Sequence, residues 1–221
     1  MNWEEILNKL ETGELRSANF INGKWEANTE VKQGILETFK AGQLEQLGDF
    51  VDKHNIPARK FSPQDGIRIV PGGSSVRRGS YVAKGVIIMP PAYINIGAYV
   101  DEGTMVDSHA LVGSCAQIGK RVHLSAGVQI GGVLEPIGQS PVIIEDDAFI
   151  GAGSVIVEGI QVKKNAIIAP GVTLSNAVPV YDCVNERQLD RGESIPENAV
   201  VVPGTRPVNK KLQWANECGL Q

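Results

Sequence analysis

A six-residue repeat of branched aliphatic residues dominates the middle of this 221-residue sequence. Reading every sixth residue from Val70 gives an unbroken aliphatic column as far as Ile130. The column resumes at Ile144 and runs to Val180, after an interval of fourteen residues that indicates an eight-residue insertion. A second column of small or branched residues, such as Ala110, lies two positions before each member. The repeat therefore has two inward positions.

A spacing of six fits neither a helix, whose period is 3.6, nor a single alternating strand, whose period is two. Six residues can form one short strand and one corner, so eighteen form one turn of a three-sided coil whose strands stack in parallel about 4.8 Å apart. We expect glycines such as Gly97, Gly113 and Gly151 at the corners, where tight bends favour a residue without a Cβ. The sequence predicts a mainly β protein, but the spacing does not give the hand of the coil.

The flanking regions divide the chain into three predicted parts. Residues 1–64 form a small helical domain, with helices over residues 3–11 and about 29–40, for which Asn2 and Thr29 are the N-cap candidates. Residues 65–182 form the coil, from which a loop at 131–141 projects toward the cleft of a neighbouring subunit. Residues 183–221 form a short C-terminal extension, with a strand near 198–202 and a polar end that forms a short helix or frays.

Composition limits the function classes. The net charge of −4 argues against general binding to nucleic acid or to an anionic membrane. The three cysteines, Cys115, Cys183 and Cys218, have no metal-ligand spacing and suit a reducing cytoplasm better than a disulfide framework. The first residues contain neither a signal peptide nor a continuous apolar span. We therefore expect a cytoplasmic protein.

One string is more specific than the repeat. Residues 93–136 read YINIGAYVDEGTMVDSHALVGSCAQIGKRVHLSAGVQIGGVLEP, and GIRIVPGGSSVRRGSYVAKGVIIMP precedes them. Together with INGKW near the N-terminus and PVIIEDDAFIGAGS later, this sequence resembles the tetrahydrodipicolinate N-succinyltransferase family. The resemblance implies a left-handed parallel β-helix of hexapeptide repeats and a homotrimer with active sites in clefts between subunits. It also implies transfer of a succinyl group from succinyl-CoA to the amine of tetrahydrodipicolinate in lysine and diaminopimelate biosynthesis, with no tightly bound cofactor.

Acyl transfer requires a base for the amine, donors for the developing oxyanion, cations for the acceptor carboxylates and a slot for the pantetheine arm. Asp107 matches the family's active-site aspartate, and Arg68 matches an arginine that contacts the acceptor. Each has a structural alternative, because an aspartate in a turn often binds backbone amides and an arginine is often a surface charge. We expect catalytic roles for Asp107 and Glu135, acceptor binding by Arg68, Asp107, Ser108 and Ser125, and coenzyme A binding by Gly131, Gly132, Ala152, Ser154, Ala169 and Lys163. The lysine pair at 210–211 is a weaker candidate for the coenzyme A phosphates.

The sequence also departs from the family pattern. Gly153 and Val155 stand where the family has an arginine and a glutamate, so either Glu135 or Glu158 replaces that glutamate or the acceptor differs. His109 stands where the family has a bulky aromatic residue, which leaves a catalytic role for this imidazole open. The C-terminus lacks the family's apolar final strand.

Two alternatives therefore remain. The first is acetyl or succinyl transfer from coenzyme A to another small amine or amino acid. The second is a non-catalytic or zinc-dependent β-helix trimer, although the histidines lack the spacing of metal ligands and we predict no metal site.

Overall fold

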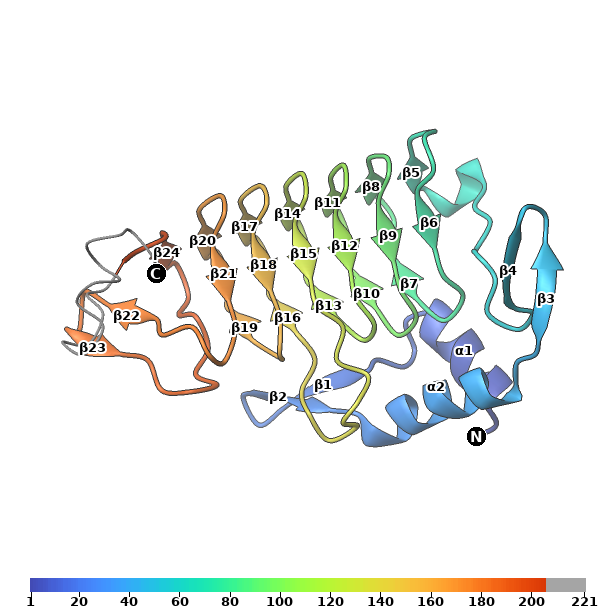
Figure 1. Ribbon diagram of the computed structural model, residues 1–221, viewed down its shortest axis with the longest axis horizontal. Helices are drawn as coiled ribbons and strands as arrows, with labels where there is room; N and C mark the ends of the chain where they lie inside the picture. The colour runs from blue at the N-terminus through green and yellow to red at the C-terminus, as the bar shows by residue number, and fades with distance from the viewer. Residues whose placement is uncertain (206–221) are drawn as a thin grey trace, which may run out of the picture.

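A three-sided parallel prism forms most of the molecule in the computed structural model, which describes residues 1–205 (Figure 1). Its three sheets, here called faces 1, 2 and 3, contain only parallel pairs, and the chain visits them in turn. The expected coil and its mainly β character are confirmed. The prediction for the last residues, including Lys210, Lys211 and Cys218, lies outside the described residues.

Each strand of the prism contains two residues. Face 1 consists of β7 (Tyr81–Val82), β10 (Tyr99–Val100), β13 (Gln117–Ile118), β16 (Ile143–Ile144) and β19 (Gln161–Val162). Face 2 consists of β5 (Arg68–Ile69), β8 (Ile87–Ile88), β11 (Met105–Val106), β14 (His123–Leu124), β17 (Phe149–Ile150), β20 (Ile167–Ile168) and β24 (Val200–Val201). Face 3 consists of β6 (Ser75–Val76), β9 (Tyr93–Ile94), β12 (Leu111–Val112), β15 (Gln129–Ile130), β18 (Val155–Ile156) and β21 (Thr173–Leu174).

The predicted inward column fills the prism. Val106 pairs in register with Ile88 on one side and with Leu124 on the other, and all three are fully buried. The small column completes the interior, since Ala98, Ala110 and Ala116 are buried in the same cluster. Burial of each large aliphatic side chain contributes about 1.5–3 kcal/mol, which makes this column the main source of stability.

The predicted column is wrong at both ends. Ile69, not Val70, pairs with Ile88, because the loop around Gly72 and Gly73 adds one residue to the first coil. At the other end Val180 precedes an antiparallel hairpin, β22 (Tyr181–Asp182) and β23 (Arg187–Gln188), and is not part of a strand of the prism. After this hairpin the chain returns, Ile195 bridges to Val162, and β24 stacks on β20.

Corners contain glycine for two different reasons. The third residue after the inward position adopts a left-handed conformation, with φ of +74° at Gly97 and +63° at His109. Gly113 and Gly151 lie at another place in the corner, where an added Cβ would come within 2.2 Å and 2.4 Å of backbone atoms of other segments. The expectation of corner positions is confirmed, but close packing, not backbone conformation, explains Gly113 and Gly151.

The N-terminal unit contains the two predicted helices, α1 (Trp3–Glu11) and α2 (Thr29–Ala41). Asn2 caps α1 as expected, whereas the cap of α2 is Asn28, whose side chain accepts a hydrogen bond from the Val31 amide, and Thr29 is the first helical residue. The sequence did not predict the two hairpins of this unit, β1 (Ala18–Ile21) with β2 (Lys24–Ala27) and β3 (Leu44–Leu47) with β4 (Phe50–Lys53). A short 3₁₀ turn at Pro63–Asp65 precedes the prism.

The insertion at 131–141 leaves the prism between β15 and β16 and lies against the N-terminal unit of its own chain (Figure 1). Leu134 packs with the cluster formed by both helices, and Lys32 of α2 donates a hydrogen bond to the Gln139 carbonyl at 2.6 Å. The loop does project from the coil. Its approach to a neighbouring subunit stays a prediction.

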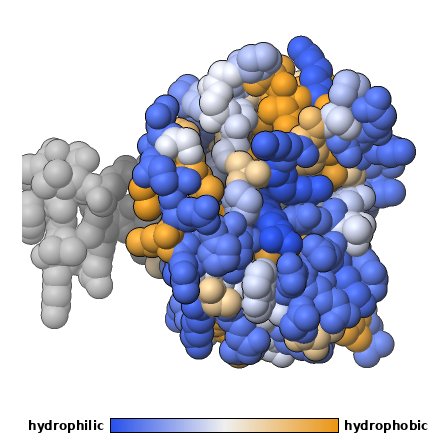
Figure 2. All heavy atoms as spheres, turned by 90° about the vertical axis from the view of Figure 1, so that its right-hand side faces the viewer, coloured by the Kyte–Doolittle hydropathy of each residue, from blue (hydrophilic) through white to orange (hydrophobic). Residues whose placement is uncertain are grey.

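Seen from the end of the prism that begins with β5 and β6, the surface is mostly hydrophilic, with separate hydrophobic patches (Figure 2). Within residues 1–205 no helix has the length and apolar character needed to cross a membrane.

Candidate active site

The three corners of the prism differ in chemistry. Corner 1–2, where strands of face 1 lead to face 2, is charged and includes Lys120, Arg121, Asp146 and Asp147. Corner 3–1 is covered by the N-terminal unit, and its residues Ile96 and Cys115 are buried in the cluster of α1 and α2. Corner 2–3 is not covered by another element of the described chain. Its turns after β14, β17 and β20 consist of small residues and one proline: Ser125, Ala126, Gly127, Gly151, Ala152, Gly153, Ala169, Pro170 and Gly171.

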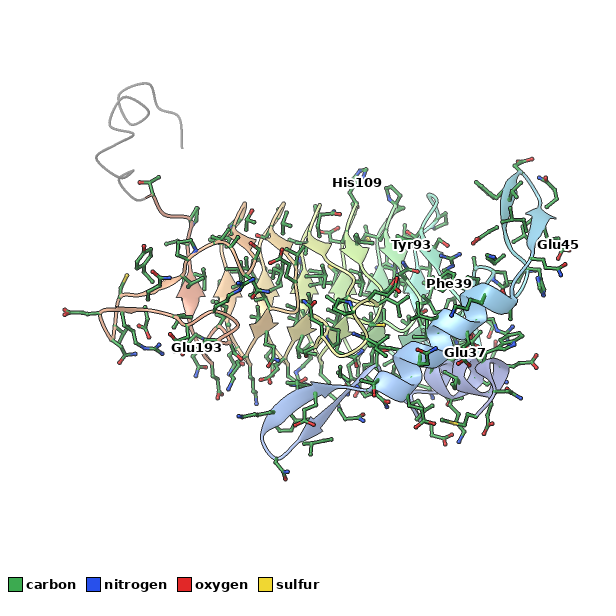
Figure 3. All side chains as sticks on the ribbon, turned by 60° about the horizontal axis from the view of Figure 1, so that its bottom comes forward. Glu37, Phe39, Glu45, Tyr93, His109 and Glu193 are labelled. Atoms are coloured by element: carbon green, nitrogen blue, oxygen red, sulfur yellow. The ribbon has the colours of Figure 1, made fainter. Side chains whose placement is uncertain are left out.

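Corner 2–3 brings together six of the predicted site residues. Asp107 and Ser108 follow β11, Ser125 follows β14, Ala152 and Ser154 follow β17, and Ala169 follows β20. Because β11 pairs in register with β8 and β14, Asp107 stacks between Met89 and Ser125, as the eighteen-residue period predicts. His109 lies in the same turn as Asp107, is exposed, and extends outward from the prism (Figure 3).

Asp107 is half-buried, and one of its carboxylate oxygens has a local role. Oδ1 accepts a hydrogen bond from the Ser108 amide at 2.7 Å, which stabilises the turn. Its other oxygen, Oδ2, has no hydrogen-bond partner within residues 1–205. Asp107 can therefore hold the corner and still present one oxygen to an amine.

The two serines of this corner differ. Ser125 is 8% exposed and lies directly above Asp107 in the stack. Ser154 is fully buried inside the prism, where its hydroxyl donates a hydrogen bond to the Ala169 carbonyl at 3.0 Å. The hydroxyl therefore has a partner inside the core, and a contact of Ser154 with coenzyme A, which only its backbone is placed to make, stays a prediction.

Face 2 is bare and mainly apolar on its outer side. Arg68 is exposed at its first strand, two strands from Met105, or roughly 10 Å along the stack. Further along, the His123 ring stacks on Phe149 with centroids 5.2 Å apart, and Phe149, Ile167 and Val200 are 42%, 44% and 67% exposed. Arg68 has no ion-pair partner within the described chain, so its guanidinium remains open to a ligand carboxylate.

Four predicted residues lie at other corners. Gly131, Gly132 and Glu135 begin the insertion at corner 3–1, and Lys163 is exposed at corner 1–2. The Gly131 amide already donates to the Ile156 carbonyl, so it is not a free donor for a thioester, and a coenzyme A contact through the rest of this residue stays a prediction. Gly132 is exposed, and its amide has no acceptor within residues 1–205. Within a single chain these four residues lie at other corners than Asp107 and do not form one site with it.

The sequence did not single out Arg16. Its guanidinium carbon lies 3.7 Å from the ring centroid of Tyr99 and 5.1 Å from that of Trp25, and its Nε donates to Gln117 at 2.9 Å. Burial lowers the pKa of Arg16, while nearby tyrosine and aspartate side chains oppose this shift. Arg16 therefore fixes the β1–β2 hairpin over face 1. Tyr81 and Tyr99, eighteen residues apart, both point outward from face 1. Two large aromatic residues at equivalent outward positions were the sequence signal that another element covers this face.

Under this hairpin lies a pocket of about 300 Å³, lined by Arg16, Phe20, Trp25 and acidic residues of corner 1–2. None of the predicted site residues lines it. Among residues 1–205, no group of three or more histidine, cysteine, aspartate or glutamate side chains is placed to hold a metal ion.

The parallel prism of hexapeptide coils places the chain in the class of hexapeptide-repeat β-helix proteins, with the uncovered corner of small residues around Asp107 as its candidate site. Residues 141–176 match the family model described as the hexapeptide repeat of succinyl-transferase, and residues 3–40 match the model of the tetrahydrodipicolinate N-succinyltransferase N-terminal region. Two proteins named 2,3,4,5-tetrahydropyridine-2,6-dicarboxylate N-succinyltransferase are similar throughout. The protein from Coxiella burnetii is 48% identical and that from Legionella pneumophila 47%, each over 92% of this chain and over 76% and 75% of the relative. The chain belongs to the tetrahydrodipicolinate N-succinyltransferase family.

A solved Campylobacter jejuni structure, provisionally named a 2,3,4,5-tetrahydropyridine-2-carboxylate N-succinyltransferase, shares the fold with a TM-score of 0.51 at 23% identity. The match covers 84% of this chain and 52% of the solved one, so the present chain spans about half of that protein.

Proposed function

We propose that this protein transfers a succinyl group from succinyl-CoA to the amine of tetrahydrodipicolinate, as the names of its relatives suggest. Water first opens the cyclic imine of tetrahydrodipicolinate to a free amine and a ketone. The amine nitrogen then attacks the thioester carbonyl carbon and loses a proton, the carbon–sulfur bond breaks, and coenzyme A leaves as the thiol. The observation that carries the proposal is Asp107, whose Oδ2 is free at the uncovered corner. In this mechanism Asp107 orients the amine and accepts its proton.

The remaining groups have roles that suit their positions. The small residues of corner 2–3, including Ala152 and Ala169, leave room for the pantetheine arm to lie close to the backbone. Arg68 provides a planar cation for an acceptor carboxylate. The Gly132 amide is the candidate donor for the oxyanion, and Glu135 and Lys163 complete the predicted set, with Lys163 toward the coenzyme A phosphates.

These groups meet only if neighbouring subunits combine different corners, so a homotrimer is part of the proposal. The exposed apolar column of face 2, ending in Phe149, Ile167 and Val200, supports it, because a monomer rarely leaves such a flat apolar face uncovered. A cytoplasmic location is also proposed, and the free thiols of Cys115 and Cys183 agree with it.

Two aspartates at equivalent places in the repeat allow a matched test. Asp101 follows Val100 as Asp107 follows Val106, and it accepts a hydrogen bond from the next amide at 2.8 Å, but it lies at corner 1–2. We expect Asp107→Asn to lower thiol release from succinyl-CoA with tetrahydrodipicolinate by about a hundredfold or more, because a general base is lost. Asp101→Asn removes only the charge, because the asparagine oxygen can still accept from the Glu102 amide, and this variant should keep near-normal turnover. Equal turnover in the two variants would exclude Asp107 from the mechanism.

The acceptor is the second question, because Gly153 and Val155 provide no charge where the family has an arginine and a glutamate. This difference favours, as a second candidate, acetyl or succinyl transfer to another small amine. Thiol release from acetyl-CoA and succinyl-CoA against a panel of amino-dicarboxylates distinguishes the two candidates. A higher kcat/KM for an acceptor other than tetrahydrodipicolinate would replace the first proposal.

A further inference from the structure

Lys32 is a lysine in the interior of the N-terminal unit. It occupies the buried side of α2, next to Val31 and near Ile35, and its relative exposure is 0%. Within residues 1–205 no carboxylate lies within ion-pair distance of its ammonium group. Burial lowers the pKa of Lys32, and the neighbouring Cys115 thiol partly opposes this effect. A lysine is seldom fully buried without an opposite charge, because removing its charge from water is costly.

The polar contact of this ammonium is with the insertion. Lys32 Nζ donates to the Gln139 carbonyl at 2.6 Å, and the two residues are 107 positions apart. The acceptor is a backbone atom near the end of the loop, so the bond constrains the path of the loop whatever side chain position 139 carries. The Gln139 side chain continues the contact by donating to the Glu158 carbonyl at 3.1 Å.

Two other contacts fix the beginning and the middle of the loop. Gly132 lies so close to Gly113 that a Cβ on Gly113 would come within 2.2 Å of the Gly132 nitrogen, which leaves the loop little freedom where it leaves the prism. Val133 is 4% exposed, and Leu134 packs against the helical cluster. Glu135, in contrast, is exposed between these anchors.

We propose that Lys32 is a positioning residue, whose buried ammonium fixes residues 133–140 on α2 so that the loop presents Gly132 and Glu135 in one conformation to the inter-subunit cleft. The role of the loop in the cleft rests on the proposed function. The fixing of the loop by Lys32 does not depend on that function. It assigns a role to the N-terminal unit: this unit acts as the support for the loop.

The ammonium suits this role better than an apolar side chain. A hydrogen bond from a charged donor is directional and stronger than one between neutral groups, so it selects one backbone position of the loop. A methionine would fill nearly the same volume without the cost of burying a charge, but it would leave the Gln139 carbonyl without its donor, so the two effects on global stability oppose each other. Global stability and loop order should therefore respond differently to the loss of the amine.

The first test measures loop order by amide hydrogen exchange in the full-length protein. In Lys32→Met, exchange at residues 133–140 should accelerate about tenfold or more, while the melting temperature changes little, because loss of the hydrogen bond and removal of the buried charge oppose each other. The matched control is Lys40→Met, which removes an exposed lysine from the same helix and should change neither. Unchanged exchange in the loop of Lys32→Met would overturn the proposal. So would a uniform acceleration over the whole N-terminal unit with a lower melting temperature, because Lys32 would then be only a structural residue.

The second test measures kinetics. Lys32→Met should raise KM for the acyl donor or the acceptor about tenfold and change kcat less, because the loop would be ordered only on binding. A KM equal to that of Lys40→Met would contradict a role of the loop in binding. If the wild-type protein releases no thiol with any acyl donor, the proposed function fails, and the exchange experiment still decides whether Lys32 fixes the loop.

Discussion

Corners 2–3 and 3–1 arise from the same repeat and have opposite environments. At both, an inward aliphatic residue is followed by a turn with a left-handed residue in the third position, His109 at one corner and Cys115 at the other. His109 is exposed, whereas Cys115 is completely buried beneath the N-terminal unit and burial raises the pKa of its thiol to about 11. The inward residues therefore determine the coil. The outward residues determine what each corner and face contacts.

The same contrast holds for the faces. Face 1 has tyrosines outward, and Tyr81 and Tyr99 stack with centroids 4.5 Å apart beneath Arg16 of the N-terminal unit. Face 2 has an apolar column outward that no described element covers. Face 1 thus has its partner within the chain, and in the trimer proposed above face 2 has its partner in another copy.

The largest expected effect is loss of the proposed trimer when charged residues are placed on face 2. Phe149→Asp combined with Ile167→Asp places two carboxylates on neighbouring strands of face 2, where burial against a second copy would leave them unpaired. Sedimentation velocity should show a trimer for the wild-type protein and a monomer of 23.7 kDa for the variant. Phe50→Asp is the control, because Phe50 is 76% exposed on the β3–β4 hairpin and should leave the trimer intact. A trimer that survives the double substitution would assign assembly to another surface.

A smaller effect is expected where the insertion meets corner 3–1. Gly113→Ala would place a Cβ 2.2 Å from the Gly132 nitrogen, a backbone atom that cannot move without displacing the loop. We expect a loss of about 1–3 kcal/mol in the free energy of unfolding, measured by urea denaturation. Gly138→Ala, in the same insertion, should cost less than about 0.5 kcal/mol because its Cβ would meet nothing within 4 Å. Similar losses for both would mean that the loop adjusts freely.

The smallest effect is a dependence on pH. Burial lowers the pKa of Lys32 below its ordinary 10.5. In the pH window between this lowered pKa and 10.5, the Lys32 amine is mostly protonated in the unfolded chain and mostly neutral in the folded chain. The unfolding free energy of the wild type, relative to Lys32→Met, should therefore rise with pH in that window, with a slope of at most about 1.4 kcal/mol per pH unit. Ionisation of Cys115 in the folded state contributes little to this comparison below pH 10, because the pKa of its buried thiol is about 11 with Lys32 present and is raised further without it. Urea denaturation at several pH values up to 10 provides the measurement, and a falling difference would contradict the direction of the shift.

The sequence predicted those parts of the structure that depend on local spacing. The inward column from Val76 to Leu174 follows from the period alone, because each of its residues meets neighbours eighteen positions away, or twenty-six across the insertion. Val70 and Val180 failed because a longer loop and a hairpin interrupt the period at the two ends. Spacing contains no information about such interruptions when an aliphatic residue happens to stand at the expected place.

The candidate site was predicted less completely. Asp107 and Ser125 come together because of the period, whereas Gly132 and Lys163 lie at other corners, and the sequence of one chain does not say how copies combine. The buried side chain of Ser154 was not foreseen, because its place in the small inward column was not used when it was chosen as a site residue. Lys32 was missed because a lysine between apolar helix positions normally reaches the surface, and its acceptor is a backbone atom 107 residues away.

The hairpin of β22 and β23 also changes how the ladder ends. A parallel β-helix of identical coils, or rungs, leaves unpaired amides and carbonyls at its last rung. Each earlier rung uses these groups to bind the next one, so the last rung can act as a template on which another molecule adds. Here the final rung is assembled from Ile195 and β24, brought together only after the chain has left the repeat. Within residues 1–205 this end of the prism is therefore irregular, and it does not offer an approaching copy a complete coil of unpaired backbone groups in the register of the repeat.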